Sequence, residues 1–378
     1  MLLERNSESG QSHAPGSATE ATAALKFGAS SEFQVELRSR VDQYFKSTGQ
    51  RPRDCLKMYV KTAIIAVWFL VSYALLVFFA PTWWLALPLA LSFAFAAAAV
   101  TFNIQHDGGH KAYSDYGWVN RLAALTMDLV GASSYLWRFK HGIFHHTCVN
   151  VVGHDTDIDT GIVARLAPQQ RRRWAHRFQH YYMWLAYGLM AVRWHLMGDF
   201  QEIIAGRIGP HKIPRPRGWD LVLFILGKVF SLGLVLVIPL FFHPFWIVAL
   251  YYLFVTGVMG VVMAVVFQLA HCVEEAEFPL PQKETQRLER SWAEHQVETT
   301  VNFARKSRIL TWLLGGLNFQ IEHHLFPRIC HIHYPALSRI VQDVCRKFGV
   351  RYTVHETLLA GIRSHFRWLR RMGMADVM

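Results

Sequence analysis

The sequence predicts an all-α integral membrane protein with four transmembrane helices, arranged as two hairpins, and a cytoplasmic helical cap. Hydrophobic residues make up 52% of the 378 residues, and charged residues make up only 17%. Soluble domains contain roughly 25% charged residues. Residues 62–105 contain no charged residue or histidine, and residues 229–270 contain only His243. Each of these two apolar blocks is long enough for two spans of about 20 residues.

Each apolar block contains a turn near its centre, at Pro81 and at Pro244. Two spans per block are therefore expected, at about 62–80, 83–105, 221–242 and 245–270. Three tryptophans lie beside the turns, as in an aromatic belt at a membrane interface: Trp83, Trp84 and Trp246. Lys228 falls inside the third apolar run, so either its ammonium group reaches back to the interface or the span begins after it.

The distribution of positive charge predicts the orientation. All 39 Lys and Arg residues lie outside the two apolar blocks, and each hairpin returns the chain to the side that it left. By the positive-inside rule, the N-terminus, residues 106–218 and residues 271–378 are expected to be cytoplasmic. The net charge of +12 is therefore explained by the cytoplasmic segments of a membrane protein, and no nucleic-acid partner is expected. Arg171, Arg172 and Arg173 are interpreted as an anchor to anionic lipid, with docking of a reductase as the alternative.

The other segments are expected to lie outside the bilayer core. Residues 1–54 are predicted to be a disordered cytoplasmic segment, residues 55–373 the membrane domain, and residues 374–378 a C-terminal tail. Residues 121–137 and 181–199 are apolar but interrupted by charged residues, which predicts interfacial helices. The five cysteines form no Cys-x-x-Cys pair, which argues against a disulfide framework and against a cysteine-based zinc site.

Histidines carry the chemistry that the sequence predicts. Of the 20 histidines, eight form groups at the cytoplasmic ends of the expected spans: His106, His110, His141, His145, His146, His271, His323 and His324. Two pairs have i, i+4 spacing, which places both rings on one face of a helix. Clustered imidazoles with few carboxylates suit a first-row transition metal such as iron, zinc or copper. Eight ligands exceed the four to six that one ion takes, so two metal ions are expected.

Two familiar kinds of metal site are excluded. The chain contains no His-Glu-x-x-His sequence, as zinc hydrolases have, and no Glu-x-x-His pair, as ferritin-like carboxylate sites have. A metal transporter with a histidine-rich pathway is the non-enzymatic alternative. That function requires ionisable groups inside the spans, and the two apolar blocks contain only His243, which lies at a turn.

Three motifs resemble the histidine boxes of the membrane fatty acid desaturases: HDGGH at 106–110, HGIFHH at 141–146 and QIEHH at 320–324. The similarity extends over about residues 55–373 and includes Trp137–His141, Gly153–Ile158 and Cys330–Pro335. Gln320, in place of the first histidine of the third box, is typical of the front-end group, which includes Δ6 desaturases. The resemblance implies a non-haem di-iron oxidoreductase in the cytoplasmic cap, which uses O2 and two electrons to introduce a cis double bond into an acyl chain.

The resemblance also implies roles for single residues. All eight histidines of the groups are implied to be iron ligands and catalytic, and Gln320 is implied to be either a ligand or a hydrogen-bonding group. Ligand rings are expected to be oriented by nearby polar residues, or those residues form a solvated loop: Asp107, His154, Asp155 and Asp157. Some relatives have an Asn where this chain has Phe267, which puts a water-mediated ligand there in doubt. The roles of His331 and His333 stay open.

The partners follow from the same resemblance. The chain has no His-Pro-Gly-Gly haem motif, so electrons are expected from a separate ferredoxin-type protein or free cytochrome b5. The substrate is a fatty acyl chain on coenzyme A or on a lipid. Other regiochemistry (Δ5, Δ9 or Δ12) and acyl hydroxylation on the same scaffold remain alternatives. Glu274, Glu275 and Glu277 are interpreted as a solvated face.

Overall fold

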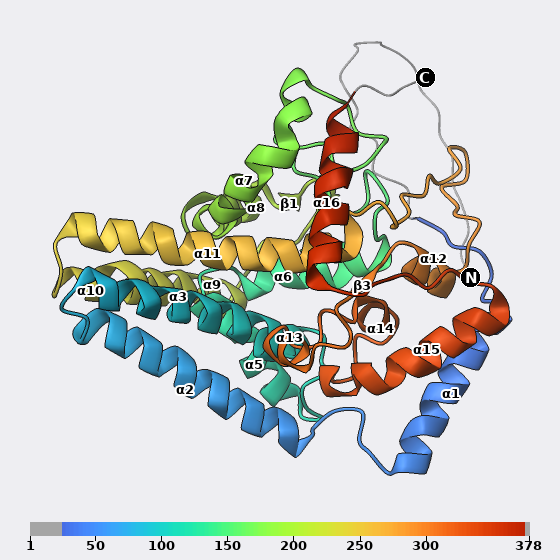
Figure 1. Cartoon of the computed structure of the whole chain (residues 1–378), viewed down its shortest axis with the longest axis horizontal. Helices are drawn as coiled ribbons and strands as arrows, with labels where there is room; N and C mark the ends of the chain where they lie inside the picture. The colour runs from blue at the N-terminus through green and yellow to red at the C-terminus, as the bar shows by residue number, and fades with distance from the viewer. Residues whose placement is uncertain (1–24, 375–378) are drawn as a thin grey trace, which may run out of the picture.

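Four long apolar helices extend from one end of the molecule, and shorter helices and loops gather at the other end (Figure 1). The computed structural model describes residues 25–374. Within them, four helices have the length and composition to cross a membrane: Leu56–Phe78, Trp83–Gly109, Trp219–Leu240 and Phe245–His271. The prediction of a mostly helical protein with four candidate spans is confirmed. The first of these helices begins at Leu56, before the expected residue 62, and it includes Lys57 and Lys61.

The first two spans pack along each other. Helix α2 (Leu56–Phe78) and helix α3 (Trp83–Val100) are joined by a short turn. The indole of Trp68 donates to the hydroxyl of Ser92 at 2.9 Å, and the rings of Phe69 and Phe93 lie 5.0 Å apart. Residues at similar distances from the turn therefore meet, so the two helices are antiparallel.

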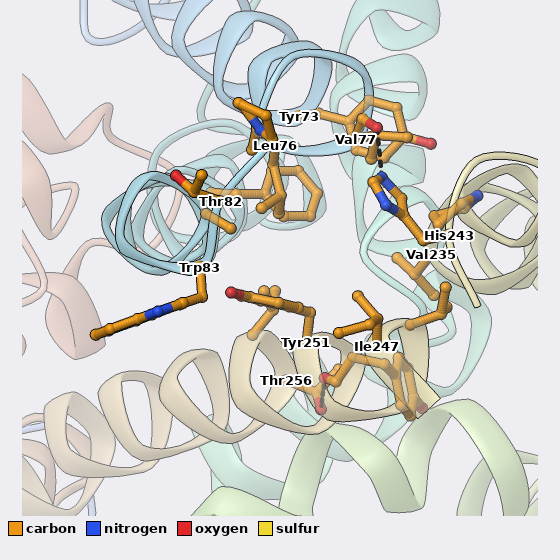
Figure 2. A pocket seen from close by; sticks show the side chains of 18 residues that line it. Tyr73, Leu76, Val77, Thr82, Trp83, Val235, His243, Ile247, Tyr251 and Thr256 are labelled. Carbon is orange, nitrogen blue, oxygen red and sulfur yellow. Dashed lines mark hydrogen bonds between the residues drawn. The ribbon is translucent and has the colours of Figure 1, made fainter. Parts of the chain in front are cut away.

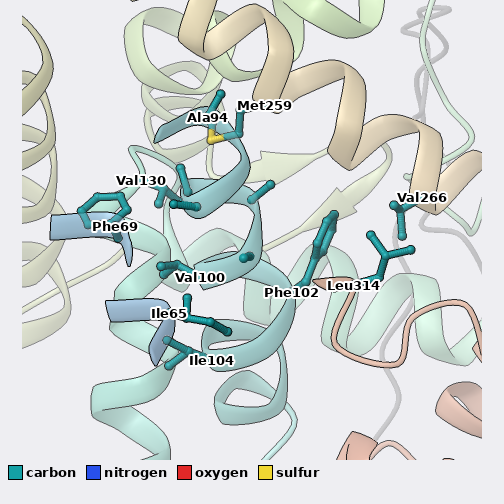
Figure 3. Close-up of a cluster of buried hydrophobic side chains, with 14 of the residues drawn as sticks. Ile65, Phe69, Ala94, Val100, Phe102, Ile104, Val130, Met259, Val266 and Leu314 are labelled. Atoms are coloured by element: carbon teal, nitrogen blue, oxygen red, sulfur yellow. The ribbon is translucent and has the colours of Figure 1, made fainter. Parts of the chain in front are cut away.

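A buried apolar core joins the spans (Figure 3). Ile65 of α2, Val100 of α3 and Met259 of α11 (Phe245–His271) belong to one cluster of buried side chains. Helix α7 (Gln179–Arg193) packs on α11, where a Cβ atom on Gly260 would lie 2.5 Å from the carbonyl oxygen of Tyr187. Small residues let helices approach this closely in membrane proteins.

Several helices are interrupted by π-helical turns. The turn η1 (Thr101–Gln105) connects α3 to α4 (His106–Gly109), and η2 (Lys140–His145) follows α6 (Ser134–Phe139). Two others are η4 (Trp194–Gly198) and η5 (Gly233–Val237). Such turns are rare and occur frequently at functional sites. Here η1 and η2 both adjoin the predicted histidine groups.

The remaining elements are short helices and two small sheets. The helices are α5 (Gly117–Leu129), η3 (Trp174–Phe178), α8 (Asp199–Ala205), α9 (Trp219–Leu232), α10 (Ile238–Leu240), α12 (Trp292–Glu298), α13 (Arg308–Leu313), α14 (Gln320–Leu325), η6 (His331–His333), α15 (Tyr334–Phe348) and α16 (Leu358–Gly373). Strand β1 (Arg207–Ile208) pairs antiparallel with β2 (His211–Lys212), and β3 (Asn302–Phe303) pairs parallel with β4 (Val354–His355). None of α5, α6 and α7, which cover the predicted interfacial helices, is among the candidate spans.

Part of the predicted disordered segment is a helix. Helix α1 (Glu32–Thr48) buries Phe33, Leu37 and Val41, which recur every four residues and form an apolar stripe. This stripe packs against α15, and Lys347 of α15 pairs with Glu36 at 2.9 Å. The expectation of disorder is therefore wrong for α1. Residues 1–24 of that segment and residues 375–378 of the predicted tail lie outside the described residues.

Lys228 lies within the candidate span Trp219–Leu240, so the expectation that the span begins after it is wrong. It lies inside α9 and is 6% exposed. Its ammonium group donates to the carboxylate of Asp199 at 2.6 Å and to the carbonyl oxygens of Gly131 and Trp194 at 2.7 and 2.8 Å. An internal carboxylate and two carbonyl groups thus compensate the buried charge, and two of these partners belong to the predicted interfacial segment 181–199.

A cavity of about 280 Å³ lies at the ends of the spans opposite to the histidine groups (Figure 2). Apolar side chains such as Leu76 and Ile247 line most of it. His243 closes one side, where its Nε2 donates to the carbonyl oxygen of Val77 at 2.7 Å. Tyr251 and His271 are 20 residues apart on α11, a helix length of about 30 Å, so this cavity is separate from the histidine cluster.

Candidate metal centre

The structure brings all eight predicted histidines together. They come from four segments: α4 and its C-cap, η2 and the residue after it, the last residue of α11, and α14. His145, His271, His323 and His324 are fully buried, and His106 and His146 are 6% and 7% exposed. Residues far apart in the sequence thus converge where two candidate spans end.

One group of ring nitrogens belongs to His106, His110, His141 and His323, which all lie within 4.8 Å of one another. The Nε2 atoms of His106 and His141 are 3.3 Å apart. Nitrogen ligands at about 2.1 Å from a metal ion lie about 3 Å from their neighbours. The spacing of these nitrogens therefore fits ligands around a shared cation.

A second group consists of His145, His271 and His324, again within 4.8 Å of one another. The Nε2 atoms of His271 and His324 lie 3.2 Å apart. His146 lies between the groups, because its Nε2 is 3.2 Å from that of His141 and its ring stacks on that of His324 at 4.4 Å. The ring nitrogens of the eight imidazoles thus lie in two adjacent groups, with His146 near both.

The second histidine motif contributes three rings from the π-helical turn η2 and the residue after it. The sequence predicts an α-helix that places His141 and His145 on one face and His146 beside them. In the structure the wider turn points His141, His145 and His146 toward the cluster, with His141 and His145 stacked at 5.2 Å. The rings of His145 and His146 lie 5.7 Å apart and nearly perpendicular to each other.

The protonation states suit metal binding. Burial, followed by the neighbouring imidazoles, holds the pKa values of His110, His146, His323 and His324 well below the ordinary value of His. These rings are therefore neutral at physiological pH, and a neutral imidazole is the form that binds metal. For His145, burial lowers the pKa, but the carboxylates of Asp155 and Asp157 outweigh burial and raise it.

Hydrogen bonds from Nδ1 leave the Nε2 atoms free. His145 Nδ1 donates to Asp155 at 3.1 Å, and His324 Nδ1 donates to the amide oxygen of Gln296 at 3.1 Å. The hydroxyl of Tyr334 lies 3.3 Å from His323 Nδ1. Nε2 of His110, His145 and His323 is buried without a hydrogen-bond partner among residues 25–374. A buried polar atom without a partner is costly, so these orphaned nitrogens fit ligands to a metal ion.

A short loop supports His145 from behind. Besides His145, the Oδ2 atom of Asp155 accepts the backbone N–H of Asn150 at 2.9 Å, and its Oδ1 atom accepts the N–H of Asp157 at 2.9 Å. The amide of Asn150 donates to the carbonyl oxygen of His271 at 2.9 Å. Asn150 has a φ of 58°, a left-handed conformation that Asn tolerates. One loop therefore links two segments of the cluster.

The other residues expected to orient ligand rings take different positions. The carboxylate of Asp157 lies 3.7 Å from His141 Nδ1. Asp107 instead accepts from His331 Nδ1 at 2.9 Å, and Nε2 of His331 lies 2.9 Å from the buried ammonium group of Lys61. His154 lies apart from the cluster, with its Nε2 3.4 Å from the amide oxygen of Gln286.

Gln320 and Phe267 lie close to the histidines. Gln320 is the first residue of α14, one turn before His323 and His324, and is 4% exposed. Its side-chain amide has no hydrogen-bond partner in the part of the chain that the structure describes. The ring of Phe267 packs 4.9 Å from both His145 and His271. An apolar ring thus occupies the position where some relatives are expected to have Asn.

Three neighbours of the cluster could not be identified as such from the sequence. Gln296 of α12 lies in no recognisable motif, and Tyr334 gave no signal beyond its place in the Cys330–Pro335 segment. Glu322 is fully buried between Asn302 and Tyr352, which donate to its carboxylate at 2.8 Å each. Burial raises its pKa to about 7, although these two hydrogen bonds act in the opposite direction.

His333 and three glutamates connect separate segments of the chain. His333 Nε2 donates to the carbonyl oxygen of Arg51 at 3.0 Å, which ties η6 to the segment before α2. The three glutamates interpreted as a solvated face are partly exposed and also contact partners: Glu274 pairs with Arg367, Glu275 with Ser364 and His355, and Glu277 with Arg351. They attach the segment after His271 to the C-terminal part of the chain. All five cysteines are free, as expected.

Comparison with known proteins identifies the family. Residues 81–356 match the family described as Fatty acid desaturase. The chain is 39% identical over 360 residues to an sn-1 linoleoyl-lipid 6-desaturase of Arthrospira platensis, covering 94% of this chain and 96% of the relative. A second sn-1 linoleoyl-lipid 6-desaturase, from Synechocystis sp., is 39% identical over 93% of this chain and 98% of its own length. An acyl-lipid (8-3)-desaturase of Physcomitrium patens is 35% identical over 91% of this chain and 72% of its own length. The chain therefore belongs to the fatty acid desaturase family and is an oxidoreductase that desaturates fatty acids.

Proposed function

We propose that this protein is a di-iron desaturase that introduces a cis double bond at a front-end, Δ6-type position in the acyl chain of a membrane lipid. The observation that carries the proposal is the convergence of eight imidazoles with unpartnered buried nitrogens. The names of the two 6-desaturase relatives support both the regiochemistry and the lipid-bound substrate.

The two groups of ring nitrogens assign the histidine ligands to two iron ions. One iron ion would be held by His106, His110, His141 and His323, and the other by His145, His271 and His324, with His146 available between them. Bound iron supplies, with O2 and two electrons, an oxidant able to attack an unactivated C–H bond. The chain itself orients the rings through Asp155, Gln296 and Tyr334.

Two further side chains, those of Phe267 and Gln320, are proposed to act beside the histidine cluster. Phe267 covers His145 and His271 with an apolar ring, which keeps water from that side of the cluster. Gln320, whose amide is free, is either a ligand or a hydrogen-bond donor to the substrate. The side chains of His154 and Asp107 bond to Gln286 and to His331, and so support the segments around the cluster.

The proposed topology follows from charge. The helix pairs α2–α3 and α9–α11 form two membrane hairpins, and residues 55–373 form one membrane domain. Both termini and the histidine cluster face the cytoplasm, because all 39 Lys and Arg residues lie outside the two apolar blocks. Electrons reach this face from a separate ferredoxin-type protein or cytochrome b5.

Expression in a host that lacks polyunsaturated fatty acids tests the function. The host is fed linoleate, and its fatty acid methyl esters are analysed by mass spectrometry. The expected product has a new double bond at Δ6, located mainly in the lipid fraction. A hydroxylated product or a double bond at another position would contradict the proposed regiochemistry. A His323→Ala variant that still gave the product would contradict the role of the cluster.

A further inference from the structure

A second cavity, of about 480 Å³, lies beside the metal centre. Its walls come from the loop after α4 and from α5, α6 and α9, which lie next to one another (Figure 1). Leu223 and Phe224 line it and belong to the beginning of a candidate span. We name this cavity the α5–α9 crevice.

The α5–α9 crevice and the metal centre share a wall. The ring of Trp137 lines the crevice, and on its other side it lies 4.8 Å from the ring of His141 and 5.0 Å from that of His110. Gly109 also lines the crevice, and a Cβ atom there would lie 2.2 Å from the Trp137 ring. Only one indole ring therefore separates the crevice from two of the predicted ligands.

Trp137 is suited to be a movable wall. Its side chain is half-buried, and its indole N–H has no hydrogen-bond partner among residues 25–374. Packing, including the contact with Gly109, therefore holds this ring in place. Rotation of this side chain would connect the crevice to the space in front of His110 and His141.

The outer part of the crevice is positively charged and lies at an interface. Its lining includes three exposed basic residues: Lys111, Arg121 and Arg138. Its acidic lining residues are Asp220, which pairs with Arg121 at 3.6 Å, and the buried Asp128. Trp118 of α5 and Trp219 of α9 flank this region and are 67% and 76% exposed. Exposed tryptophans at the start of a span mark the depth of lipid head groups.

The crevice therefore has two chemically different ends. Basic side chains of the lining are exposed, whereas its buried or half-buried side chains include the apolar Ala124, Leu125, Phe224 and Trp137 together with the polar Asn120 and Asp128. A molecule that matches both ends has an anionic group and a hydrocarbon chain. At the depth of the head groups, that description fits an anionic glycerolipid of the surrounding bilayer.

We propose that the α5–α9 crevice is a lateral portal through which an acyl lipid with an anionic head group enters from the adjacent leaflet. Lys111, Arg121 and Arg138 hold the head group, and the acyl chain passes Trp137 to reach the histidines. This inference rests on the proposed function as a desaturase of lipid-bound acyl chains. It adds the route of entry and a preference for negative charge.

Filling the crevice tests the route. Ala124→Trp places a large ring inside it, whereas Leu122→Trp changes a 58% exposed residue of the same helix that does not line the crevice. We expect Ala124→Trp to lower lipid desaturation at least tenfold with the iron content unchanged, and Leu122→Trp to keep wild-type activity. Wild-type activity of an iron-loaded Ala124→Trp protein would overturn the portal. Absence of desaturation by the wild-type protein would instead contradict the proposed function.

Removing the positive charge tests the head-group preference, independently of whether Ala124→Trp folds. The triple variant Lys111→Gln/Arg121→Gln/Arg138→Gln is compared with Arg363→Gln/Arg370→Gln/Arg371→Gln, which removes the same charge from α16. In nanodiscs, phosphatidylglycerol and an uncharged galactolipid carry the same acyl chains. We expect the crevice variant to raise KM for phosphatidylglycerol about tenfold with kcat retained, and to leave KM for the galactolipid unchanged. Equal KM values for phosphatidylglycerol in all three proteins would overturn the head-group site.

Discussion

Single side chains behind the imidazoles decide how the cluster presents its nitrogens. Asp155 holds His145 through Nδ1, and Gln296 holds His324 in the same way. Each bond fixes the tautomer and directs Nε2 toward the other rings. The histidine motifs predicted which rings meet, but the partners of those rings could be identified only in part, because Gln296 lies far from every motif and carries no spacing signal.

Asp155→Asn removes the charge behind His145 while keeping the shape of the side chain. Residues that orient ligand imidazoles typically contribute 10- to 100-fold to metal affinity or activity. We expect activity and iron affinity to fall within that range. Asp159→Asn, at an exposed position of the same loop, is the control. Iron binding is measured by titration of the purified protein, and equal affinities in the two variants would contradict the role of Asp155.

Substitutions of Gln320 test whether the residue that is typical of the front-end group takes part in the chemistry. Gln320→Ala removes an amide without removing any of the eight imidazoles, so we expect nearly no activity with iron largely retained. Gln320→His restores a strong nitrogen ligand, and we expect a folded, iron-loaded protein with reduced activity or altered double-bond position. Product analysis and metal content are measured on the same preparations. Full activity and an unchanged product for Gln320→Ala would show that this residue only packs.

At the scale of elements, hydrophobic runs predicted the spans well, whereas turns within helices could not be predicted. Four candidate spans lie where apolar blocks predict them. The π-helical turns η1 and η2 were missed, since His106–His110 and His141–His146 have ordinary helical spacing and no local residue marks a widened turn. Helix α1 was missed because its apolar stripe is sparse and gains stability only by packing on α15.

The buried ion pair of Lys228 with Asp199 joins α9 to α8 and could not be inferred from either segment alone. Lys228→Met leaves the Asp199 carboxylate buried without its partner, and such a change typically costs about 3–5 kcal/mol of unfolding free energy. The double variant Lys228→Met/Asp199→Leu removes both charges, so we expect it to be more stable than Lys228→Met. Unfolding in mixed micelles measures both. A Lys228→Met protein as stable as wild type would contradict the structural role of the pair.

At the scale of the whole molecule, the proposed topology places every histidine ligand on one side of the membrane. Reporter fusions at residues 40, 215 and 300 are expected to report the cytoplasm, and fusions at Pro81 or Pro244 the opposite side. The reason is that both apolar blocks lack Lys and Arg. A non-cytoplasmic signal at residue 215 would contradict the two-hairpin topology and separate the histidine groups.

The central claim is that the eight imidazoles hold two iron ions, and metal analysis of the purified protein tests it most directly. The account predicts about two iron atoms per chain, on the basis of two adjacent groups of ring nitrogens. It also predicts loss of iron in His145→Ala and His323→Ala, while both variants still insert into the membrane because neither residue lies in a candidate span. Stoichiometric zinc without iron, or a single metal ion per chain, would contradict the claim.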